Sequence, residues 1–104
     1  MDNYFVSMYQ VLKLIEYCSY QERFDYSLFE PENLHITDKE LKIILSNCLN
    51  ENLITGISIS PNFVGFKNIN AHLTTKGYEF LEENSSMKKA YKIAKEIKDW
   101  IPGL

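Results

Sequence analysis

Arginine and cysteine are scarce in this chain of 104 residues. Arg23 is the single arginine, so lysine alone is left to form the concentrated basic face with which DNA-binding proteins neutralise phosphates. Cys18 and Cys48 are too few and too far apart to form a disulfide framework. Both fit apolar helical positions, and we expect them to be buried and reduced.

Long apolar runs are absent as well. No run approaches the roughly eighteen residues that a membrane span requires, and Met1-Asp2-Asn3 is acidic where a signal peptide carries positive charge. We therefore expect a cytoplasmic protein with no membrane contact. The composition, 45% hydrophobic and 24% charged, is typical of globular proteins, and the length predicts a single domain over residues 1–104.

The net charge of −3 is unevenly distributed along the chain. Between Met1 and His35, six acidic residues accompany only Lys13 and Arg23. The segment from Ser85 to Leu104 has five lysines and two acidic residues. A basic face suited to phosphates is therefore available only in this last segment.

Residues 1–18 contain the first predicted helix, from Tyr4 to Cys18. It is apolar on almost every side, because several large apolar residues lie off its main stripe, which consists of Phe5, Met8, Tyr9, Leu12 and Ile15. A helix of this kind is usually buried on more than one side. In so short a chain the pattern predicts a homodimer that packs through this helix and the last one.

Residues 27–52 are predicted to form a helix-turn-helix. Its second helix, about Asp38 to Asn52, begins at a capping box in which Thr37 and Glu40 satisfy two backbone amides reciprocally. Residues 53–73 are predicted to form a hairpin of two strands, and residues 74–101 two C-terminal helices. This order predicts the α+β class: a winged helix-turn-helix with a two-stranded wing and extra C-terminal helices.

The last predicted helix has two distinct faces. Lys88, Lys92 and Lys95 share one face, which is either a phosphate-contacting stripe or an ordinary solvated surface. We expect Trp100 to be an anchor in the core. The apolar stripe consists of Met87, Ala90, Ala94, Ile97 and Ile101.

Two stretches carry a family resemblance. With Leu73-Thr74-Thr75-Lys76-Gly77 and with Ala90-Tyr91-Lys92-Ile93-Ala94-Lys95-Glu96-Ile97-Lys98-Asp99-Trp100-Ile101, the sequence resembles the YjcQ-like family of small proteins from Gram-positive bacteria and their prophages. The resemblance implies a winged-helix fold with an extra C-terminal helix, in a family whose biochemical role is not established. It implies no catalytic or binding residues.

A recognition helix presents its solvent face to the major groove, where lysine and asparagine contact base edges. On the helix from Asp38 this face offers Lys39, Lys42, Asn47 and Asn50, and Lys67 on the wing is placed to contact phosphate. The same face contains Asp38 and Glu40 and no arginine. An ordinary solvated face explains it equally well.

The predicted tip of the wing contains Phe63 and Phe66, which are poorly suited to a solvated hairpin. Such side chains wedge between base steps in some architectural proteins, but they more often mark a protein contact or fold back onto the core. The aromatic segment from Tyr20 to Phe29 is a second candidate for protein contact.

No catalytic, metal-binding or cofactor-binding motif is present in the sequence, so we expect a non-enzymatic protein without a cofactor. The fold favours a small DNA-binding or transcription-related regulator of bacterial or prophage origin that binds double-stranded DNA. The charge distribution favours the alternative, a protein-binding adaptor or inhibitor that contacts a host or phage protein through a winged-helix scaffold.

Overall fold

The computed structural model describes residues 4–59 and 67–86. Over these ranges the elements, in chain order, are α1 (Tyr4–Ser19), the 3-10 helix η1 (Tyr26–Phe29), α2 (Pro31–Leu34), α3 (Asp38–Asn50), β1 (Ile54–Ser58), β2 (Lys67–Leu73) and α4 (Thr75–Glu83). The α+β class is confirmed, and the order of elements is compatible with a winged helix. The predicted helix over residues 87–101 and the hairpin tip with Phe63 and Phe66 lie outside the described residues.

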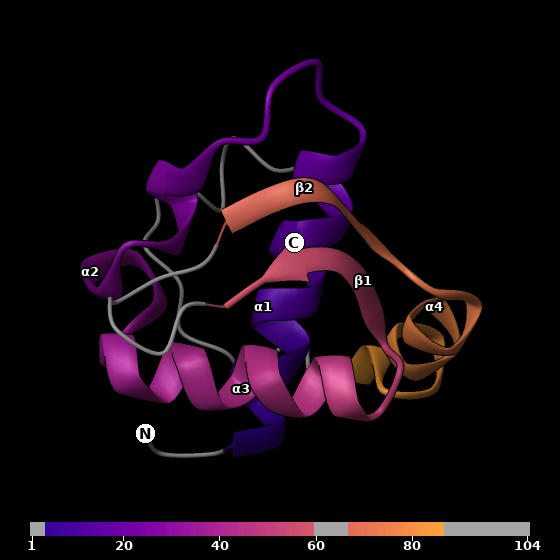
Figure 1. Ribbon diagram of the computed structural model, residues 1–104. Helices are drawn as coiled ribbons and strands as arrows, with labels where there is room; N and C mark the ends of the chain where they lie inside the picture. The colour runs from indigo at the N-terminus through magenta and orange to yellow at the C-terminus, as the bar shows by residue number, and fades with distance from the viewer. Residues whose placement is uncertain (1–3, 60–66, 87–104) are drawn as a thin grey trace.

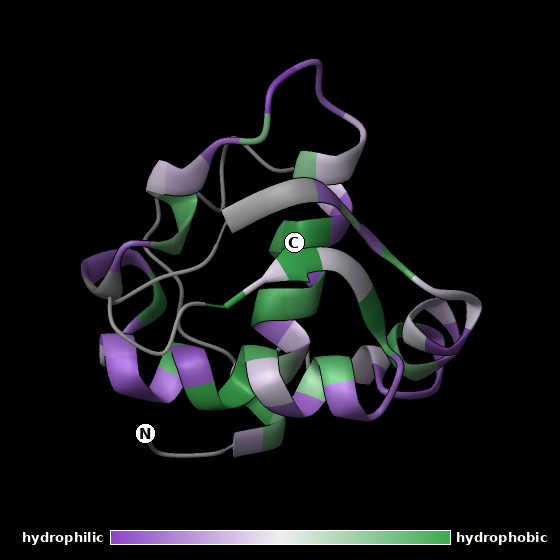
Figure 2. Cartoon of the chain, viewed as in Figure 1, coloured by the Kyte–Doolittle hydropathy of each residue, from purple (hydrophilic) through white to green (hydrophobic). Residues whose placement is uncertain are grey.

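Helix α1 runs through the middle of the molecule, with the two strands on one side of it and α3 across one end (Figure 1). Figure 2 shows apolar residues concentrated along α1 and on the neighbouring parts of α3 and β1. Eight residues of α1 are buried: Met8, Tyr9, Gln10, Val11, Leu12, Leu14, Ile15 and Cys18. Packing within one chain therefore explains the apolar character of this helix, and the homodimer stays a prediction.

Gln10 is the buried polar residue of the described core. Its side-chain amide donates a hydrogen bond of 3.3 Å to the carbonyl oxygen of Leu34, at the end of α2. A buried amide without such a partner would destabilise the fold. The bond therefore fixes the short helix α2 against the middle of α1.

Helix α3 is capped at both ends. At its start the hydroxyl of Thr37 accepts from the amide of Glu40, and the amide of Thr37 donates to the Glu40 carboxylate, which lowers the pKa of that carboxyl. At its end Asn52 adopts a left-handed φ of 59°, while the amides of Asn52 and Leu53 donate to Leu49 and Cys48. These bonds form a Schellman motif, which explains why the helix stops at Asn50.

The antiparallel hairpin of β1 and β2 changes register in the middle. Ile54 pairs with Leu73, but Ile57 pairs with Asn68, so the register shifts between Thr55 and Ile57. Gly56 lies at this irregularity with a φ of +75°, and a Cβ atom there would lie 2.1 Å from the carbonyl oxygen of Asn70. Only glycine fits this close approach of the two strands.

Helix α4 begins where the hairpin ends. The hydroxyl of Thr74 accepts from the amide of Gly77 and also donates to the carbonyl oxygen of Asn52. A Cβ atom on Gly77 would lie 2.2 Å from the carbonyl oxygen of Leu53, so the first turn of α4 packs directly on the backbone that follows α3. These contacts hold the end of α3, the end of β2 and the start of α4 together.

Candidate interaction surface

Helix α3 has one buried and one exposed face, as its apolar spacing requires. Leu41, Ile44, Leu45 and Cys48 are buried and form the inner face. The outer face is an exposed stripe of four residues at helical spacing: Lys39, Ile43, Asn47 and Asn50. We call these four residues the α3 stripe.

The predicted DNA-contacting residues fall only partly on this stripe. Lys39, Asn47 and Asn50 are exposed on it, whereas Lys42 is half-buried beside it. Lys67 is the first residue of β2 and pairs with Ser58, so it belongs to the hairpin and is separated from α3 along the chain. The structure thus brings three of the five predicted residues onto one helix face.

The α3 stripe contains one apolar residue that sequence reasoning missed. Ile43 is 45% exposed, between Lys39 and Asn47. The apolar pattern of the helix is satisfied by Leu41, Ile44 and Leu45, and this leaves Ile43 as an apolar residue outside the core-facing set. An isoleucine outside the core-facing set is the feature of the sequence from which an exposed apolar residue could have been predicted.

A groove lies beside the stripe, where the start of α1, the end of α3 and α4 come together. It has a volume of about 510 Å³. The described residues that line it are Tyr4, Phe5, Met8, Asn47, Glu51, Leu53, Lys76 and Phe80. Five of these eight side chains are apolar or aromatic, so the groove offers an apolar surface with three polar groups around it.

Contacts within the groove hold its wall in place. The side-chain amide of Asn47 donates a hydrogen bond of 2.9 Å to the hydroxyl of Tyr4. The rings of Tyr4 and Phe5 meet edge to face, with centroids 5.3 Å apart. Asn47 therefore belongs both to the α3 stripe and to the groove, and its amide already has a protein partner.

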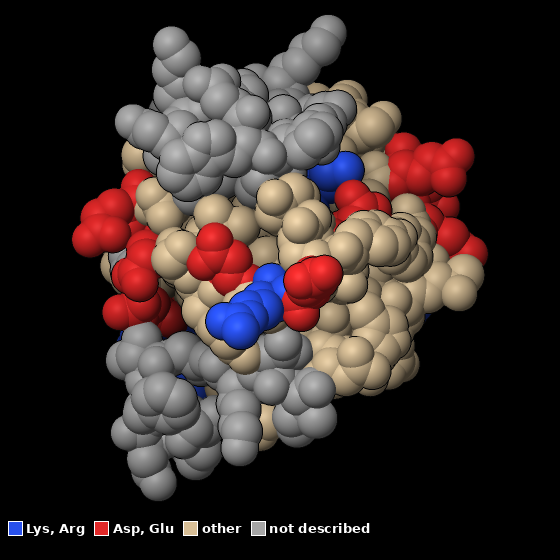
Figure 3. Space-filling model, turned by 90° about the horizontal axis from the view of Figure 1, so that it is seen from above, with Lys and Arg blue, Asp and Glu red and all other residues tan. Residues whose placement is uncertain are grey.

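The electrostatic character of the described surface is acidic. Within residues 4–59 and 67–86 there are eleven acidic and six basic residues. Figure 3 shows acidic side chains at both edges of one face, with few basic ones between them. No dense cluster of lysines on the described part of that face offers a track for phosphates.

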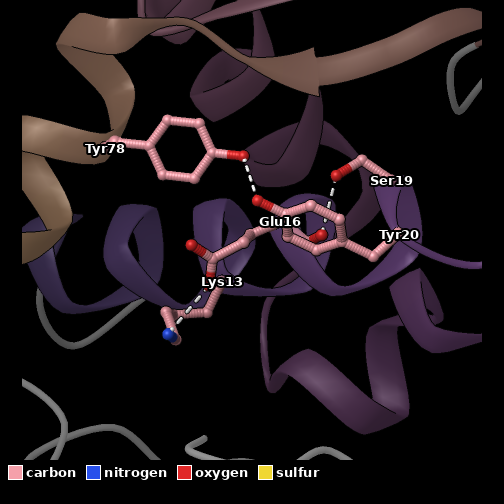
Figure 4. Close-up of polar contacts among 5 residues, drawn as sticks. All are labelled: Lys13, Glu16, Ser19, Tyr20 and Tyr78. Carbon is pink, nitrogen blue, oxygen red and sulfur yellow. Dashed lines mark hydrogen bonds and ion pairs between the residues drawn. The ribbon is translucent and has the colours of Figure 1, made fainter.

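A pair of tyrosines joins the end of α1 to α4. The hydroxyls of Tyr20 and Tyr78 share a hydrogen bond of 2.8 Å, next to the ion pair of Lys13 and Glu16 (Figure 4). The hydrogen bond with Tyr20 raises the pKa of Tyr78 to about 12. Tyr20 is 71% exposed, so this aromatic pair is a surface feature outside the groove.

Both cysteines are buried free thiols, as predicted. Burial raises the pKa of Cys18 to about 11 and that of Cys48 to about 12, so both thiols are protonated at neutral pH. Neither has the lowered pKa that marks a reactive cysteine.

The described residues contain neither a metal-binding cluster nor a membrane-spanning helix. Among them no group of three histidine, cysteine or acidic side chains is arranged to hold a metal ion. None of the described helices combines the length and the apolar content that crossing a membrane requires.

Comparison with known proteins identifies relatives of this chain. The family model described as YjcQ protein matches residues 9–100. The chain is also similar to the uncharacterized protein YjcQ of Bacillus subtilis (strain 168), with 32% identity over 88 residues, which is 84% of this chain and 94% of that protein. No solved structure matches the chain.

Proposed function

Because this chain belongs to the YjcQ family, whose relative in Bacillus subtilis has no assigned activity, we propose a function from the geometry of its surface: a protein-binding module that contacts its partner through the α3 stripe. The partner surface that fits is apolar at its centre and basic at its edge. This is the adaptor role that the charge distribution favours.

The exposure of Ile43 is the observation that carries the proposal. Burying a fully exposed isoleucine contributes about 1.5–3 kcal/mol, and covering the 45% of Ile43 that is exposed would contribute roughly half of that. A protein surface can supply that apolar contact, whereas the base edges of the major groove are mainly hydrogen-bonding groups, with the thymine methyl as their apolar feature. The middle of the stripe therefore matches a protein partner better than DNA.

The neighbouring side chains support the same choice. The hydrogen bond to Tyr4 already uses one N–H of the Asn47 amide and fixes its orientation, which leaves fewer groups of this side chain for a base. Asp38 begins α3, and Glu51 follows it, so acidic groups lie at both ends of the helix. Acidic groups repel phosphate but attract a basic rim on a protein partner.

Double-stranded DNA is the second candidate, and the order of elements supports it. Helix α2, a short turn, helix α3 and the hairpin follow one another as in a winged helix-turn-helix. Lys39 and Asn50 are exposed on α3, where base or phosphate contacts would be made. Lys67 would add a phosphate contact from the hairpin.

Fluorescence anisotropy with mixed-sequence duplex DNA separates the two functions. We would titrate the wild type, the double variant Lys39→Ala with Lys42→Ala, and Ile43→Glu, at low and at physiological salt. For a protein-binding module we expect no salt-dependent binding by any of the three. Steeply salt-dependent binding that the double variant loses and Ile43→Glu keeps would establish the DNA-binding function instead.

Affinity capture from the source cells then tests the protein contact itself. We expect the wild type and the double lysine variant to retain the same partner, and Ile43→Glu to lose it while remaining folded. Thr55→Glu is the matched control, since it introduces the same charge at an exposed position of β1 outside the stripe. A partner that all variants retain would show that α3 is not the contact.

A further inference from the structure

We infer that the groove between α1, α3 and α4 is the docking site of the chain's own C-terminal segment, residues 87–104. This inference does not depend on what the α3 stripe binds. It concerns the neighbouring surface, which shares only Asn47 with the stripe, and it commits to one occupant, the segment that directly follows the described residues.

The groove has the properties of a site for an apolar side chain. Met8, Leu53 and Phe80 supply apolar surface, and Phe5 adds a ring that is 55% exposed. The volume of about 510 Å³ is many times the roughly 30 Å³ that one water molecule occupies in the liquid. Apolar surface of this kind is stabilised when another apolar group covers it.

The C-terminal segment carries a complementary pattern. Its apolar residues recur at helical spacing and leave Lys88, Lys92 and Lys95 on another face, so one side of the segment suits an apolar groove. Trp100 lies in sequence between Ile97 and Ile101 on the apolar part of the pattern. This is the arrangement by which amphipathic helices bind hydrophobic grooves.

Chain connectivity places the segment close to the groove. Lys76 and Phe80 of α4 line the groove, and the described chain ends at Ser86, shortly after α4. The segment therefore starts from an element that forms one wall. Intramolecular docking gains from this short connection, because the effective concentration of a tethered segment is high.

Charge favours the same pairing. The C-terminal segment from residue 87 has five lysines and two acidic residues, while the described residues carry eleven acidic and six basic side chains. Glu51 lies in the groove lining, where it can meet one of the lysines. The family match extends to residue 100, which indicates that most of the segment belongs to the shared domain.

Trp100 is the single tryptophan of the chain, so its fluorescence in the full-length protein reports directly on the segment. We would compare the emission maximum and the acrylamide quenching of the wild type, Phe5→Glu and Ile43→Glu. Ile43→Glu is the matched control, because it places the same charge at a similarly exposed apolar position outside the groove lining. Circular dichroism establishes that each variant is folded.

We expect Phe5→Glu to shift the emission to the red and to increase quenching, with no change in Ile43→Glu. Ile97→Glu, a change within the segment, should produce the same shift, and the two changes combined should add nothing further. Emission that Phe5→Glu leaves unchanged in a folded protein would overturn the inference. A shift that depends on protein concentration would also overturn it, because the groove would then hold the segment of a second copy.

Discussion

The side-chain amide of Asn47 on α3 donates a hydrogen bond of 2.9 Å to the hydroxyl of Tyr4, the first residue of α1. The two residues are separated by 43 positions in the sequence. Asn47 is one of the residues that the sequence suggested for base contacts, yet its amide is engaged within the protein. Its first role in this structure is to join α3 to the start of α1.

Substitution of Asn47 with alanine should therefore destabilise the protein, whereas the same change at Asn50 should have little effect. One hydrogen bond contributes about 1 kcal/mol to the free energy of unfolding, and Asn50 is exposed on the same stripe. Urea unfolding of both variants measures the difference. Equal unfolding free energies would show that the bond to Tyr4 contributes nothing to stability.

Asn52 ends α3 in a left-handed conformation with a φ of 59°. Alanine at this position should lower the free energy of unfolding by roughly 1 kcal/mol, because its Cβ disfavours that conformation without the compensation that asparagine offers. Glycine should be neutral or stabilising. Thermal unfolding of the pair tests this, and the expectation fails if alanine is tolerated as well as glycine.

Gly56→Ala should be among the most destabilising single changes in the hairpin. The new Cβ would meet the carbonyl oxygen of Asn70 at 2.1 Å and would stand at a φ of +75°. A conformation of this kind alone costs about 1–3 kcal/mol, and the clash adds to it. Thr55→Ala, a change at the exposed neighbour, is the control in chemical unfolding, and comparable losses in both variants would contradict the strand geometry.

The hydrogen bond between Tyr20 and Tyr78 predicts that the stability of the protein depends on pH in the alkaline range. The pKa of Tyr78 is about 12 in the folded protein, above its ordinary value of 10.0, so the protonated form is favoured in the fold. Its contribution to stability is fully present below pH 10 and is lost as the pH rises through 12. Tyr20→Phe removes the hydrogen-bonding hydroxyl and should lower the pKa of Tyr78 towards its ordinary value.

Carbon NMR of labelled tyrosine rings measures this change residue by residue. Tyr78→Phe identifies the signal of Tyr78 by its disappearance from the spectrum. A pKa of Tyr78 that stays at its raised value in Tyr20→Phe would show that the hydroxyl of Tyr20 is not its cause.

Local motifs made much of the fold predictable. Thr37 with Glu40 three residues later determines the start of α3, and Thr74 determines the start of α4, because each side chain accepts from an amide in the turn that follows it. The hairpin was predicted for the same local reason, from a strand-like stretch that starts at Leu53, a turn-rich middle and a second strand that ends at Leu73. Such signals act over a few residues and are visible in a single sequence.

Features that depend on distant contacts were not predictable. The partnership of Asn47 with Tyr4 and the groove formed by three helices arise only when the chain is folded. The apolar residues on almost every side of α1 led us to predict a homodimer. In the structure, β2, α3 and α4 of the same chain contact this helix. Exposure of Ile43 also depends on how α3 is rotated against the core, which apolar spacing defines only approximately.

The hydroxyl of Thr74 and the backbone of Gly77 fix the base of the hairpin against Asn52 and Leu53. The end of α3 and the start of α4 consequently lie side by side, although the whole hairpin separates them in the sequence. The spacing of these two helices is therefore set by the contacts of Thr74 and Gly77, at the base of the hairpin, and not by the part of the hairpin beyond them.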